Sequence, residues 1–207
     1  MRTIVAFTLS MLFLSEGITG EDKSEPLLLD VISYEDFVRE DATALGVLER
    51  ALYEKGIVGV KGIPGYRELV LNFINSARQF SALPEDVKES YGRGEGEMFL
   101  GYEKGKERFK NAAGKWVVDD LKISYYGLVP DTSHNKWPHE VDLRKSFLAL
   151  GALMKQMGES VMTKIGLLGP KTGIFLDETT HASGRMLYYR KSIDGGSENP
   201  FWFSSLA

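Results

Sequence analysis

Three histidines are the residues of this sequence best suited to metal chemistry. His134, His139 and His181 could each offer an imidazole nitrogen to a metal ion. His181 follows Asp177 by four residues, a spacing that would bring both side chains to one face of a helix. A solvated loop with incidental charges explains this spacing better, so the sequence predicts no metal ligand.

Other common catalytic arrangements are absent from the sequence. It has no cysteine, which excludes disulfides, thiolate metal sites and cysteine nucleophiles. The glycine-rich stretch GRGEGEMFLG lacks the Lys-Ser/Thr ending of a phosphate-binding loop. No serine lies in a nucleophile-elbow pattern. The run from Lys104 to Lys115 carries charges of both signs and is interpreted as a solvated loop.

The composition indicates a globular protein without a nucleic-acid partner. Of its 207 residues, 43% are hydrophobic and 26% charged, and the formal net charge is -4. Residues 1–20 combine one early positive charge, an apolar stretch and small residues, which is typical of a secretory signal peptide. The alternatives are a buried N-terminal element or a start codon placed too early. The protein is secreted or periplasmic if the signal functions and cytoplasmic otherwise, and no segment reaches transmembrane length.

Apolar periodicity and capping residues predict the elements that follow this segment. Strands are expected at 27–32, 57–63, 121–128 and 185–189, and helices at 34–55, 66–81, from Pro84 and at 143–167. Ser33 is the expected N-cap of the first helix, with Asp36 three residues later, and Gly56 is its expected C-cap. A long glycine-rich surface loop is expected at 92–116. The order of elements predicts an α+β fold in which helices precede most of the sheet.

Several segments, in this order, resemble the non-haem iron(II), 2-oxoglutarate-dependent oxygenases of the isopenicillin N synthase-like group. LLLDVI is similar to the opening strand of that family, LERALYEKGIVGVKGIP to its first helix-strand unit, and ARQFSALPEDVKESY to its helix junction. NKWP (Asn135 to Pro138) resembles its NxWP turn, and RMLYYRK resembles LRLNYYP, the first strand of its double-stranded β-helix. The resemblance covers most of residues 27–202.

The resemblance implies an iron held by a His-x-Asp pair and a distant histidine, with 2-oxoglutarate bound beside it. No histidine here is followed two residues later by an acid, since the acids after His139 stand at the wrong offsets. Tyr189 matches the family tyrosine that reaches the 2-oxoglutarate carboxylate, but Leu187 and Arg190 replace the usual Asn and Pro. An ordinary pair of strand aromatics, one inward and one outward, explains Tyr188 and Tyr189 at least as well.

The resemblance therefore predicts a dioxygenase N-terminal-like domain at 27–180 and the start of a jelly-roll oxygenase domain, cut before its iron triad, at 181–207. The intact relative would oxidise a small organic molecule with Fe(II) and 2-oxoglutarate. This chain is expected to bind neither alone and to be inactive. The alternative is a non-catalytic binding or interaction module. Incomplete closure of the jelly roll would leave strand edges unpaired, which predicts self-association.

Overall fold

The computed structural model describes residues 28–92, 94, 100–111, 114–119, 121–177 and 180–189, so the predicted signal segment 1–20 lies outside the described residues. The helices are α1 (Tyr34–Val38), α2 (Ala42–Lys55), α3 (Tyr66–Ala82), α4 (Glu85–Ser90) and α5 (Leu143–Lys164). The strands are β1 (Val31–Ser33), β2 (Gly59–Lys61), β3 (Gly101–Lys104), β4 (Arg108–Lys110), β5 (Trp116–Val118), β6 (Lys122–Val129) and β7 (Ala182–Tyr189). This mixture of helices and strands agrees with the predicted α+β class.

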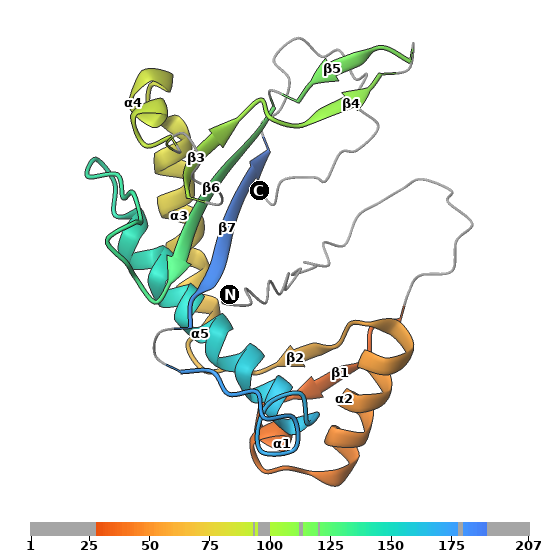
Figure 1. Cartoon of the computed structure of the whole chain (residues 1–207). Coiled ribbons are helices and arrows are strands. Elements are labelled where there is room, and N and C mark those ends of the chain that lie inside the picture. Colours follow the sequence, from red (N-terminus) through yellow and green to blue (C-terminus); the bar gives the residue numbers. More distant parts are fainter. Residues whose placement is uncertain are drawn as a thin grey trace. The chain divides into compact units, whose positions relative to one another are not determined.

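The chain divides into two compact units. One contains Leu69–Lys155 together with β7, and the other contains the described residues up to Glu68 together with Gln156–Asp177. In the second unit β1 and β2 pair in parallel, and α1 and α2 accompany them (Figure 1). Its core consists of apolar side chains from these elements and from the last turns of α5, with Ile32, Phe37, Ala44 and Leu48 buried.

The predicted helix 34–55 is wrong as a continuous element, because it is interrupted between α1 and α2. Glu40 has a φ of 58°, which a continuing α-helix does not allow. Asp41 then caps α2 by accepting a hydrogen bond from the Ala44 N–H at 2.9 Å. The caps at Ser33 and Gly56 are confirmed, the latter by its left-handed φ of 69°.

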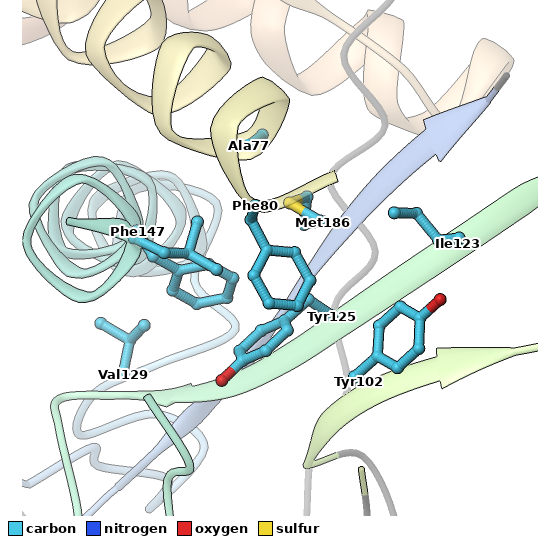
Figure 2. Packing of buried hydrophobic residues seen from close by; sticks show 9 residues of the cluster. Ala77, Phe80, Tyr102, Ile123, Tyr125, Val129, Phe147 and Met186 are labelled. Carbon is cyan, nitrogen blue, oxygen red and sulfur yellow. The ribbon is translucent and has the colours of Figure 1, made fainter. Parts of the chain in front are cut away.

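The larger unit is built on a three-stranded antiparallel sheet in the order β3-β6-β7 (Figure 1). One face of this sheet packs against α3 and α5. Phe80 lies within 5.0 Å of the Tyr125 ring centroid in an edge-to-face arrangement, and Met186 and Ile123 complete the buried layer (Figure 2). The central strand β6 is buried along most of its length.

Two glycines allow the sheet to approach α5 closely. A Cβ at Gly184 would lie 2.7 Å from the Phe147 ring, and one at Gly127 would lie 2.9 Å from the Trp137 ring. These two glycines face each other across β6 and β7. The absence of side chains there leaves the space that the two aromatic rings fill.

The expected surface loop at 92–116 is wrong in part, because it contains the strands β3 and β4 and ends at the first residue of β5. Residues 93, 95–99, 112 and 113 of this expected loop lie outside the described residues. Tyr102 pairs with Tyr125 in the sheet, and its side chain is buried. Gly101, with a φ of 69°, permits the turn into β3, since a Cβ there would overlap the Tyr91 carbonyl oxygen. Further along, β4 and β5 form a separate antiparallel hairpin. Lys104, Arg108 and Lys110, which suggested a loop, lie within these short strands. Gly105 and Gly114 lie in the connections between the strands.

Candidate functional site

The strand β7 presents two different faces. Tyr188 pairs with Ile123 and is half-buried against the helix-packed core. Tyr189 pairs with Lys122, lies on the opposite face and is 45% exposed. The alternation of strand side chains produces this difference. The only residue predicted to contact a cofactor, Tyr189, therefore lies on the sheet face that α3 and α5 do not cover.

An ion-pair cluster lies on the same face as Tyr189. Lys122 and Arg185 each contact one carboxylate oxygen of Glu107, and the Arg185–Glu107 distance is 3.0 Å. Arg185 also donates to the Ser124 hydroxyl at 2.9 Å and lies 5.0 Å from the Tyr126 ring centroid. The hydrogen bond from Lys122, reinforced by Arg185, outweighs partial burial and lowers the pKa of Glu107. The cluster thus binds a carboxylate with two cations.

A second charged cluster lies where α4 meets β3. The Lys88 side chain is only 2% exposed, and its ammonium contacts the Glu85 carboxylate at 3.2 Å and the Ser81 carbonyl at 3.3 Å. Tyr102 donates to the other Glu85 oxygen at 2.5 Å. Partial burial raises the pKa of Glu85, but Tyr102, Lys88 and Lys104 outweigh it and lower this pKa to about 2. Every polar group named here has a partner, so the cluster holds α4 to the sheet.

The three histidines are separated among different connections. His134 precedes the NKWP turn and His181 precedes β7, and both are exposed. His139 lies in an exposed group in which its Nδ1 is 2.6 Å from the Tyr91 hydroxyl and its Nε2 is 3.4 Å from the Glu140 carboxylate. Tyr91 and His139 also meet edge to face. This group ties Tyr91, at the C-terminal end of α4, to the turn before α5.

The described residues do not fit an iron site. Within that part of the chain no three His, Asp or Glu side chains gather closely enough to hold a metal ion. Asp177 and His181 lie outside the described helices, so the four-residue spacing places them on no helical face.

Sequence reasoning missed the three charged residues of the sheet face. Lys122 stands inside the expected strand 121–128, and Arg185 begins RMLYYRK, which resembles the family only as a whole segment. Glu107 falls in the run from Lys104 to Lys115, whose mixed charges indicate a solvated loop. The alternation in LKISYY could have placed Lys122 and Ser124 on one face, opposite Ile123. Only the strand pairing of β6 with β7 brings Arg185 to the same place.

Solved structures with a similar fold include one protein described as an oxygenase and one bound to alpha-KG. A protein from Caulobacter crescentus described as a 2OG-Fe(II) oxygenase family protein matches with a TM-score of 0.55 and 22% identity, over 67% of this chain and 48% of that chain. A full-length Neurospora crassa protein in complex with alpha-KG matches with a TM-score of 0.54 and 24% identity, over 67% and 46%. The same Neurospora protein with alpha-KG and 5-formyluracil matches with a TM-score of 0.52 and 22% identity, over 67% and 44%.

These comparisons establish a shared fold. The chain spans about half the length of the solved structures it matches. No family model and no curated protein matches the sequence. No helix in the described part of the chain is both long and apolar enough to span a bilayer. The chain therefore shares part of the fold of a protein described as a 2OG-Fe(II) oxygenase family protein, which agrees at the level of the fold with the resemblance seen in the sequence.

Proposed function

We propose that this chain forms part of an Fe(II)- and 2-oxoglutarate-dependent oxygenase of the isopenicillin N synthase-like group, acting on a small organic molecule. Residues 27–180 correspond to its N-terminal-like domain, and 181–207 begin its jelly-roll domain. The observation that supports this best is the position of Tyr189, on the face of a sheet left open by the helices, in a fold shared with a protein solved in complex with alpha-KG.

In this proposal Tyr189 donates a hydrogen bond from its hydroxyl to a carboxylate of 2-oxoglutarate. Bound iron would supply the activation of oxygen. The 207 residues contain no His-x-Asp or His-x-Glu sequence, so the iron ligands of such an enzyme would come from outside this sequence. The chain alone is then expected to produce no succinate. Its own contribution is the sheet, and the side chains that position an anionic cosubstrate on it.

Two measurements on the purified chain test this proposal. Incubation with Fe(II), 2-oxoglutarate and oxygen should give no succinate above a protein-free control. The position of Tyr189 on the open sheet face changes the expectation that the chain alone binds no cofactor. The thermal midpoint should rise with 2-oxoglutarate in the wild type and not in Tyr189→Phe, while Tyr53→Phe, a tyrosine on α2 that is 92% exposed, should respond like the wild type. Succinate production would refute the proposal that the iron ligands come from outside this sequence. An equal shift of the midpoint with 2-oxoglutarate in Tyr189→Phe and Tyr53→Phe would exclude Tyr189 from the binding site.

A non-catalytic interaction module is the second candidate function. Within the described residues β7 has only β6 as a strand neighbour, and the exposed side chains of Leu187 and Tyr189 lie beside its other edge. A strand from a partner could extend the sheet at this edge through main-chain hydrogen bonds. A stable complex with an extended peptide, formed without 2-oxoglutarate, would favour this function over the first.

A further inference from the structure

We propose that Lys122, Arg185 and Ser124 form a binding site for the carboxylate group of a small molecule, and that Glu107 occupies this site as an internal stand-in. The proposal concerns anion binding by the sheet, and it does not depend on whether the chain serves an oxygenase. It differs from the proposed contact of Tyr189 because two cations, rather than one hydroxyl, bind the anion.

The two cations are fixed on neighbouring strands. Lys122 opens β6 and its side chain is only 8% exposed, although a lysine ammonium is seldom buried without a partner. Arg185 on β7 is held by two hydrogen bonds to the Ser124 hydroxyl, at 2.9 and 3.3 Å, and by the Tyr126 ring. These contacts set the direction of the guanidinium before any ligand arrives, which reduces the entropy cost of binding.

The carboxylate that fills the site belongs to a surface connection. Glu107 lies between β3 and β4, outside the sheet, and its side chain is 52% exposed. One of its oxygens contacts Lys122 and the other contacts Arg185, as the two oxygens of a ligand carboxylate would. Since the cations are fixed and the acid is not part of the sheet, an external carboxylate can replace Glu107 without disturbing a strand.

The neighbours of the cations indicate the rest of the ligand. Tyr189 pairs with Lys122, and Leu187 pairs with Ser124, so both side chains lie on the same face beside the site. Both are substantially exposed and can cover an apolar group. The site therefore fits a carboxylate that carries an apolar or aromatic body.

Chemical rescue of Glu107→Ala tests the proposal. In sodium chloride this variant should unfold at a lower temperature than the wild type, because Lys122 loses the partner of its buried ammonium. Sodium acetate at the same ionic strength should restore the midpoint. At ten times its dissociation constant, a ligand that binds only the folded state raises the folding constant about elevenfold. Sodium phenylacetate should reach the same effect at a lower concentration, because its ring can cover Leu187 and Tyr189.

Matched variants separate a site from a general salt effect. Glu40→Ala removes another surface carboxylate from a lysine, Lys164, at 2.8 Å, but no arginine or serine lies in that ion pair, so acetate should not rescue it. The double variant Glu107→Ala/Lys122→Met should lose the rescue. If Glu107→Ala is not recovered in folded form, the same acetate titration is made on Glu107→Gln. Its neutral amide also leaves the charges of Lys122 and Arg185 uncompensated. Equal midpoints in acetate and chloride, or equal rescue of Glu40→Ala, would overturn the site. Equal potency of acetate and phenylacetate would overturn its apolar part.

Discussion

Replacing Glu85 by Gln should destabilise the larger unit mainly because it leaves Lys88 without its carboxylate. The pKa of Glu85, lowered from 4.5 to about 2, corresponds to about 3.4 kcal/mol of preference for the charged form. The Glu85 side chain is 36% exposed, so solvent screening reduces this value to about 2 kcal/mol. The Lys88 side chain is 2% exposed, so water cannot replace the lost carboxylate as the partner of its ammonium. We expect Glu85→Gln to lower the free energy of unfolding by about 2 to 3 kcal/mol at pH 7.

The lowered pKa of Glu85 determines how the stability difference between wild type and Glu85→Gln depends on pH. Because the pKa of Glu85 is lowered on folding, its stabilising effect is fully present above about pH 4.5 and is lost as the pH falls toward 2. Urea unfolding curves of wild type and Glu85→Gln should therefore differ at pH 7 and converge near pH 2. The double variant Glu85→Gln/Lys88→Met should regain most of the loss, because it removes the uncompensated buried charge.

The control is Glu35→Gln, which also removes an acid from the first turn of a helix. Glu35 is exposed and contacts Arg39 at 3.6 Å, so the change should cost less than about 0.5 kcal/mol. A loss for Glu85→Gln no larger than that of Glu35→Gln, or a difference from wild type that persists at pH 2, would refute the role assigned to the buried ion pair.

Three further predictions concern packing and association. Tyr125→Phe should increase the free energy of unfolding by about 1 kcal/mol and so raise the thermal midpoint, because the buried Tyr125 hydroxyl has no protein partner. A clear loss of stability would contradict this. Gly184→Ala should cost about 1 to 3 kcal/mol in urea unfolding, since its Cβ would meet Phe147, whereas Gly158→Ala on α5 meets nothing and should be neutral or stabilising. Leu187→Lys should reduce concentration-dependent self-association in light scattering by placing a charge beside the β7 edge, and unchanged association would exclude that edge.

Local signals in the sequence were sufficient for most helices and for β6 and β7. The caps at Ser33 and Gly56 and the apolar stripes of α3 and α5 act within a few residues, so they can be read without the fold. The sequence did not predict the break before α2, because the break depends on the backbone conformation of one residue, Glu40. A glutamate side chain does not indicate a positive φ.

The sheet face was less accessible to sequence reasoning. The strands β3, β4 and β5 are only three or four residues long, and glycines and lysines border them, so their composition matches that of a loop. The cation pair depends on Lys122 and Arg185, which are 63 positions apart in the numbering and meet only through Glu107 and the pairing of two strands. Nothing in the spacing of such residues distinguishes a shared site from two separate surface charges.

The pairing of β6 with β7 also has a kinetic consequence. The pairing of β3 with β6 closes a short stretch of chain, but β7 joins the same strand only after α5 and its connections have been crossed. Closing that longer loop costs more chain entropy, and the cost is incurred before the strand contacts repay it. The hairpin-like part of the sheet should therefore assemble first, with one edge of β6 unpaired until β7 arrives. The face that carries Lys122, Arg185 and Tyr189 comes into existence only at that last event.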